Sequence, residues 1–166
     1  VPSFDIESPY YRWTREWDIN ELENVLKGTL AAQSKTGFVT PALKKGEDLG
    51  TITDIKVMKR GESGKLMEVE IITPRGCYKV SKELVIRRVF QKNGVSLPSA
   101  NVVFIKSIDN YGNLTNIKAV GVGFGHGVGM SQFGAGYMAS KLNQPYYNIL
   151  RHYYTGISLG TIPVTI

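Results

Sequence analysis

The 166-residue sequence has a single cysteine, Cys77, and no apolar run long enough to cross a bilayer. One cysteine cannot close an internal disulfide or supply the cysteine pairs of a structural zinc site, so we expect Cys77 to be a small buried residue. A membrane-spanning helix needs about 20 consecutive apolar residues. The N-terminus also lacks both a methionine and the layout of a signal peptide. The sequence therefore predicts a soluble piece, either processed or cut from a longer parent.

Acidic residues are fewer than basic ones, at 14 against 20, which gives a net charge of +6. Such an excess favours polyanionic partners: nucleic acid, anionic lipid or an acidic wall polymer. The basic residues are dispersed in pairs such as Lys44-Lys45 and Arg87-Arg88, which is typical of a solvated surface. No strand motif of alternating aromatic and basic residues is present, so we expect no nucleic-acid partner.

The hydrophobic content of 42% is enough for a normal core, so the sequence predicts one domain over residues 1–166, with two small domains as the alternative. Near the N-terminus, Asp18 or Asn20 can cap a short helix that Gly28 ends. Its apolar residues, spaced by three and four positions, share one face: Leu22, Val25 and Leu26. Residues 33–50 mix glycine, proline and lysine, and they indicate a loop or a weak strand.

From Thr51 the apolar period changes to two, which predicts β-strands. The turn at 61–64 closes a hairpin, and a second turn at 74–76 leads into another strand. Ser81 can then cap a short helix. Its apolar residues are Leu84, Val85 and Val89.

Two further strands, 102–105 and 117–120, flank the turn-rich residues 109–113. The expected fold class is therefore α+β. It combines a largely antiparallel sheet with short helices at the N-terminal end, and a glycine-rich loop followed by two helices at the C-terminal end.

Residues 121–129 place glycine at every second position, which an ordinary strand does not require. A ligand, another strand or left-handed turns of the chain itself can account for such a bare backbone. The glycine spacing does not match the dinucleotide-binding fingerprint, and no Gly-Lys-Ser/Thr phosphate loop occurs. We therefore expect no nucleotide and no other cofactor.

Past this loop, apolar residues at helical spacing predict a helix from Met130 to Leu142, and its other positions are unusually small. A second helix, residues 146–154, ends at Gly156. His126, Ser131 and Gln132 are then expected to point into one cleft at the N-terminus of the first helix. The helix dipole there favours anionic or hydroxyl-rich ligands.

The block GHGVGMSQFGAGYMA, followed by YYNILRHYYTGISL, resembles the signature that closes the domain of the stage II sporulation protein D and LytB family. KRGESGKLMEVEI resembles the family's preceding hairpin. The likeness covers about two-thirds of the chain, from Thr51 onward, and corresponds to the C-terminal part of the family domain.

The resemblance implies a bacterial protein that works on peptidoglycan, either secreted or anchored at the outer face of the membrane through an anchor outside this chain. Family members are lytic transglycosylases, which cleave MurNAc-GlcNAc linkages, or enhancers of a wall amidase. The implied partners are peptidoglycan glycan strands, together with other cell-wall hydrolases or an upstream segment.

In the family, the catalytic glutamate lies in a Glu-Met-Pro stretch upstream, and this sequence contains no such stretch. Cleavage of a glycan requires a carboxyl whose pKa is raised by an apolar enclosure. The glutamates fall instead in a turn or on polar faces of helices and strands: Glu21, Glu23, Glu62, Glu68 and Glu70. We therefore expect the glycan-binding, active-site-completing half of a transglycosylase; the alternative is a non-catalytic, amidase-enhancing wall-binding module.

His126 is the expected supporting catalytic residue, because flanking glycines let a ligand reach its ring; the alternative is a structural bond to a nearby carbonyl. The expected substrate-binding residues are Gly125, Gly127, Ser131, Gln132 and Tyr153. Ser131 lacks the context of a hydrolase nucleophile, so it caps the helix or binds a ligand hydroxyl.

His152 is expected to be structural, and no metal site is expected because His126, His152 and Cys77 lack compact ligand spacing. The tyrosines of the last helix can stack on sugar faces, although a place in the core beneath the loop is the preferred interpretation. These are Tyr146, Tyr147, Tyr153 and Tyr154.

Overall fold

The computed structural model describes residues 4–160, which group into two compact units. The larger unit is Arg12–His126, and the smaller one combines the residues up to Tyr11 with those from Gly127 onward. One boundary therefore lies inside the glycine-rich segment. A single domain over residues 1–166 stays a prediction.

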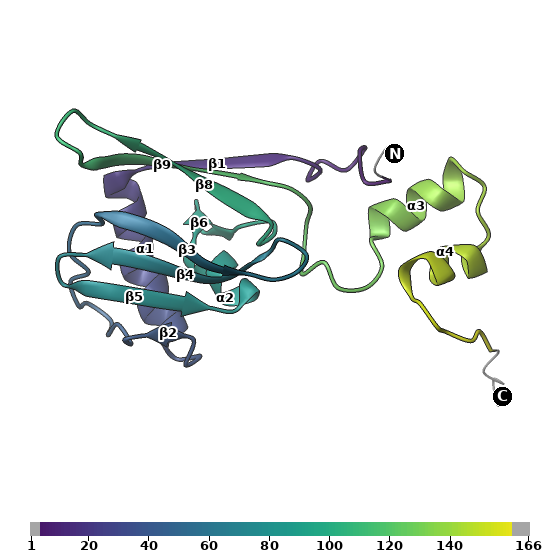
Figure 1. The fold of residues 1–166 in the computed structure, drawn as a ribbon, viewed down its shortest axis with the longest axis horizontal. Helices are drawn as coiled ribbons and strands as arrows, with labels where there is room; N and C mark the ends of the chain where they lie inside the picture. Colours follow the sequence, from purple (N-terminus) through teal and green to yellow (C-terminus); the bar gives the residue numbers. More distant parts are fainter. Residues whose placement is uncertain (1–3, 161–166) are drawn as a thin grey trace. The chain divides into compact units, whose positions relative to one another are not determined.

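The larger unit, all of whose residues are described, contains three antiparallel sheets (Figure 1). One has the order β1-β9-β8, formed by Trp13–Asp18, Leu114–Gly121 and Val102–Ile108. The second has the order β2-β5-β4-β3, formed by Val39–Thr40, Gly76–Ser81, Leu66–Thr73 and Asp54–Arg60. A two-stranded ribbon, β6 and β7, comprises Gln91–Lys92 and Val95–Ser96. The antiparallel pairing and the hairpins β3-β4, β4-β5 and β8-β9 confirm the predictions.

Strand β1 was not predicted. It pairs along its whole length with β9, from Trp13 opposite Gly121 to Asp18 opposite Asn116. Its two tryptophans are buried and stand four positions apart, while all three residues between them are polar. Trp17 anchors the strand further, because its Nε1 donates a hydrogen bond to the carbonyl of Gln91 at 2.7 Å.

Helix α1 spans Ile19–Ser34, and Asp18 caps it by accepting a hydrogen bond from the Glu21 amide at 2.9 Å. The predicted start is confirmed, but the predicted end at Gly28 is wrong. A glycine inside a helix costs about 1 kcal/mol. The buried face continues through the next turn, and burying one more leucine outweighs that cost. This face consists of Leu22, Leu26 and Leu30.

Helix α2 spans Glu83–Val89, as predicted, with Val85, Ile86 and Val89 buried. Its predicted cap is wrong. Ser81 is the last residue of β5, and Lys82, with φ of 72°, precedes the helix without any side-chain cap.

The core of the larger unit lies where α1 and α2 pack on the sheets, with α1 contacting β1, β9 and β2, and α2 contacting β4 and β5 (Figure 1). Phe90, at the end of α2, is fully buried and meets the Phe104 ring at a centroid distance of 4.8 Å. Cys77 is exposed, so its predicted burial is wrong. On β5 the alternating inward positions belong to Tyr78 and Val80, which turns Cys77 outward.

The smaller unit contains helices α3, Gln132–Ser140, and α4, Tyr146–Tyr153, which pack against each other. Met138 and Ile149 are buried in this unit. The two C-terminal helices confirm the prediction, and the fold as a whole is α+β. Within residues 4–160, no helix has the length and apolar character needed to cross a membrane.

Candidate functional site

The alternating glycines of residues 121–129 have two distinct structural reasons. Gly121 ends β9, and a Cβ there would overlap the indole ring of Trp13. That ring also donates a hydrogen bond from Nε1 to the carbonyl of Gly123 at 3.0 Å. Gly121 therefore makes room for a tryptophan of the same unit.

The other four glycines occupy the left-handed region that disfavours side chains. Their φ angles are 76° at Gly123, 85° at Gly125, 65° at Gly127 and 87° at Gly129. The amide of Gly125 also donates a hydrogen bond to the carbonyl of Pro98 at 2.8 Å. Left-handed turns, one of the three predicted explanations, therefore account for these positions without a bound ligand.

His126 is exposed and is the last residue of the larger unit. Ser131 and Gln132 belong to the smaller unit. Their convergence with His126 on one cleft accordingly stays a prediction, as does the supporting catalytic role of His126.

Ser131 is the N-cap of α3, which is one of its two predicted roles. Its Oγ accepts a hydrogen bond from the Gly134 amide at 3.1 Å and donates one to Asp5 Oδ1 at 2.5 Å. Asp5 comes from the N-terminal segment, so this pair of bonds fixes that segment to the start of α3.

Tyr153, on α4, completes a polar cluster with Asp5 and Ser131, which we call the Asp5 cluster. A Cβ at Gly134 would overlap the Tyr153 hydroxyl, so this hydroxyl lies directly against the α3 backbone. Burial raises the pKa of Tyr153, the Asp5 carboxylate raises it further, and a hydrogen bond with Ser131 opposes both effects. The Asp5 cluster therefore joins three segments of the smaller unit.

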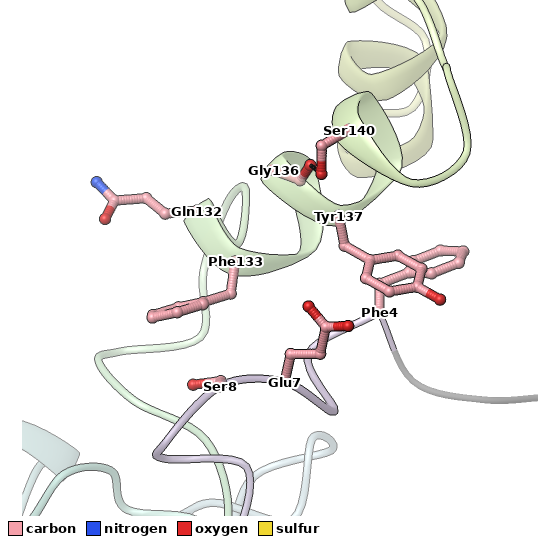
Figure 2. A pocket seen from close by; sticks show the side chains of 8 residues that line it. All are labelled: Phe4, Glu7, Ser8, Gln132, Phe133, Gly136, Tyr137 and Ser140. Atoms are coloured by element: carbon pink, nitrogen blue, oxygen red, sulfur yellow. Dashed lines mark hydrogen bonds between the residues drawn. The ribbon is translucent and has the colours of Figure 1, made fainter.

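A pocket of about 410 Å³ opens beside the Asp5 cluster, between α3 and the N-terminal segment (Figure 2). Its α3 residues recur at intervals of three and four positions and thus share one helix face. They are Phe133, Gly136, Tyr137 and Ser140, with Gln132 at the edge. Phe4, Glu7 and Ser8 close the opposite side.

Three lining residues, Phe4, Glu7 and Ser8, were not predicted, since nothing local in the sequence links them to a helix more than 120 positions away. The Phe4 ring stacks on Tyr137 at a centroid distance of 6.1 Å and meets His152 edge-on at 5.4 Å. Figure 2 shows the Glu7 side chain pointing toward α3, whereas the amide of Gln132 points away from it.

The expected core role of the tyrosines on the last helix is wrong for three of them. Tyr146 is 72% exposed, Tyr147 43% and Tyr154 40%. The inward side of α4 is taken by Ile149, which leaves the pair Tyr146 and Tyr147, with centroids 5.6 Å apart, at the surface. The alternative interpretation, stacking on sugar faces, needs this kind of exposure.

His152 packs edge-on against both Phe4 and Tyr153, in keeping with its expected structural role. Across residues 4–160, no three His, Cys, Asp or Glu side chains gather closely enough to hold a metal ion.

Comparison with known proteins places this α+β chain in a family. The model of a family described as Domain of unknown function (DUF8618) matches residues 3–129, and the chain belongs to that family. A curated relative is stage II sporulation protein D from Bacillus amyloliquefaciens, which is 31% identical over 157 residues. The match covers 95% of this chain but only 36% of the relative. This similarity confirms the predicted resemblance, and no solved structure matches the chain.

Proposed function

We propose that this chain is a peptidoglycan-acting module of a sporulation and cell-wall protein, located outside the cytoplasm. In this proposal the chain forms the half of a lytic transglycosylase that binds the glycan and completes the active site, and the whole enzyme cleaves MurNAc-GlcNAc linkages. The observation that carries the proposal is the similarity to stage II sporulation protein D across 95% of the chain.

The surface of the smaller unit supports glycan binding. Tyr146 and Tyr147 present adjacent rings to solvent, and Phe133 is 49% exposed at the edge of the pocket. Aromatic faces of this kind pack against the apolar faces of sugar rings. The net charge of +6 also favours an acidic wall polymer.

Two aspartates have pKa values displaced in the direction that disfavours a role as general acid. The Gly50 amide and Arg75 hold the pKa of Asp48 below its usual range, and hydrogen bonds from Asn113 do the same for Asp109. A general acid in glycan cleavage needs the opposite displacement.

The test is to incubate purified sacculi with the 166-residue chain and with a full-length protein that carries it, and to analyse the soluble products by mass spectrometry. We expect the chain to sediment with sacculi without releasing 1,6-anhydro sugars, and the full-length protein to release them. Stimulation of a wall amidase without anhydro products would replace the transglycosylase role by the amidase-enhancing one. Failure of the chain to sediment with sacculi would overturn the proposal.

A further inference from the structure

The pocket between α3 and the N-terminal segment has a single charged group. Among its eight lining residues only Glu7 has an acidic or basic side chain, and the rest are aromatic, amide, hydroxyl or glycine residues. Within residues 4–160, the Glu7 carboxylate has no hydrogen-bond or ion-pair partner. Glu7 is exposed, so only water neighbours its charge, and a cationic ligand can approach the carboxylate without displacing a protein partner.

Aromatic rings form much of the remaining wall. Phe133 and Tyr137 stand one helical turn apart on the face of α3 toward which Glu7 points (Figure 2). Phe4 backs the Tyr137 ring in a stacked arrangement. The faces of such rings attract cations.

The Glu7 carboxylate and the aromatic rings together favour one class of ligand. An anion would be repelled by Glu7, and a neutral sugar would gain no charge attraction from it. A primary ammonium group satisfies both features, since it donates charge-assisted hydrogen bonds to the carboxylate while its carbon atoms rest on the rings.

The size of the pocket suits a small group rather than a polymer. Gly136 contributes no side chain, and a Cβ there would meet nothing within 4 Å, so the wall is open at this position. A volume of about 410 Å³ lies within the usual range of small-ligand sites.

We propose that this pocket binds a primary ammonium group of the wall polymer, with Glu7 as its counter-ion and Phe133 and Tyr137 as its aromatic walls. This inference rests on the proposed peptidoglycan function. Two parts of the polymer can supply the group: a de-N-acetylated amino sugar of the glycan strand, or the free side-chain amine of a diamino acid in the stem peptide.

The experiment measures the affinity of the whole 166-residue chain for two matched pairs of probes by NMR titration. One pair is a glucosamine oligomer and its N-acetylated form. The other is a muropeptide with a free diamino-acid amine and the same muropeptide acetylated there. In at least one pair, we expect the free amine to bind about fivefold more tightly, the scale of a partly exposed ion pair with ring contacts. The pair with the larger ratio identifies the source of the amine.

Two pocket variants and one control test whether the preference for the free amine arises in this pocket. Glu7→Gln should remove the preference for the free amine without changing the affinity for the acetylated probe, whereas Glu62→Gln, an equal charge change in the exposed turn of the larger unit, should leave it intact. Gly136→Leu should weaken both members of the preferred pair by filling the pocket.

Equal binding of free and acetylated probes in both pairs would overturn the inference, and so would an unchanged preference in Glu7→Gln. If sacculi still sediment the chain in either case, the proposed function survives. If the chain binds free amines selectively but does not sediment with sacculi, the ammonium site is supported and the wall-polymer assignment is overturned.

Discussion

At the scale of single residues, two glycines of α3 that stand two positions apart occupy opposite environments. A Cβ at Gly134 would overlap the Tyr153 hydroxyl and come within 3.3 Å of Asp5 Oδ1. A Cβ at Gly136 would meet nothing within 4 Å. The two glycines therefore have different roles. Gly134 leaves room for the Asp5 cluster, and Gly136 leaves the pocket open.

We expect Gly134→Ala to destabilise the smaller unit by about 1–3 kcal/mol, because overpacking would displace a hydroxyl held by its neighbours. Gly136→Ala should instead stabilise it by up to about 1 kcal/mol through helix propensity. Urea unfolding followed by near-UV tyrosine signals measures both. Gly28→Ala, an equally open helical position of α1, is the control for propensity alone. Equal effects of Gly134→Ala and Gly136→Ala would contradict the assigned contact.

The left-handed glycines of the loop lead to a second prediction. Gly125→Val and Gly127→Val should each cost about 1–3 kcal/mol, because a β-branched residue is strained at φ of 85° or 65°. Gly61→Ala in the first hairpin should be nearly neutral, since its Cβ would make an ordinary contact of 3.6 Å with Met67 Cγ. Melting temperatures and co-sedimentation with sacculi measure the three variants side by side. Similar stability and binding for all three would rule out the strain.

At the scale of helices and strands, the sequence predicts best what depends on neighbours along the chain. The hairpins follow from a period of two interrupted by turn residues, and the start of α1 follows from one aspartate. Strand β1 was missed because its partner, β9, lies about 100 positions away, so its pairing depends on tertiary structure. The end of α1 was missed because burial of Leu30 overrides the signal of Gly28.

The candidate site likewise has local features that the sequence predicts and tertiary contacts that it does not. The helix-capping role of Ser131 is local and was among the predicted roles. The hydrogen bond from its hydroxyl to Asp5 and the contribution of Glu7 to the pocket both bring the N-terminal segment to α3. No periodicity within a window of the sequence can indicate such contacts, since they depend on how the smaller unit is assembled.

Strands β3 and β8 belong to different sheets and are joined by side chains. Lys106 Nζ lies 2.7 Å from Asp54 Oδ1, and Arg60 donates a hydrogen bond to the carbonyl of Val102 at 2.9 Å. Burial raises the pKa of Asp54, but the hydrogen bond from Lys106 and that from the Ile55 amide outweigh it, and the pKa falls below 3.8. A lowered pKa stabilises the folded state above the unfolded value, and this contribution disappears as the pH falls through the folded value.

Asp54→Asn should therefore destabilise the larger unit at pH 7, by less than about 1 kcal/mol because the pair is partly exposed. The difference from the wild type should shrink as the pH falls below 3.8 and also in 1 M salt. Urea unfolding at pH 7, 4 and 2.5 gives the comparison. A difference that stays constant over this range would assign the effect of the variant to something other than the charge of Asp54.

At the scale of the whole molecule, the family match and the sporulation relative cover different extents. The family model ends at Gly129, before α3 begins, whereas the similarity to stage II sporulation protein D extends over 157 residues. Helices α3 and α4, with the pocket and the exposed tyrosines, are thus largely outside the matched family domain. The chain spans about a third of that relative's length, 36%, so the activity of the whole protein has to be tested in a longer chain.

His126 can be tested in a longer protein that carries this chain. Gly125 and Gly127 flank it with bare, left-handed backbone, and His126 is an exposed residue. A neutral imidazole can bond a sugar hydroxyl or acetamido group, or orient an acid, without being the proton donor. We expect His126→Ala to lower turnover on sacculi by roughly 10²-fold, the lower end for a positioned acid-base partner, and to leave the melting temperature unchanged. His152→Ala is the comparison, because it removes a ring packed on Phe4 and Tyr153 and should lower the melting temperature. Wild-type turnover in His126→Ala, or a loss matched by unfolding, would leave His126 with a structural role only.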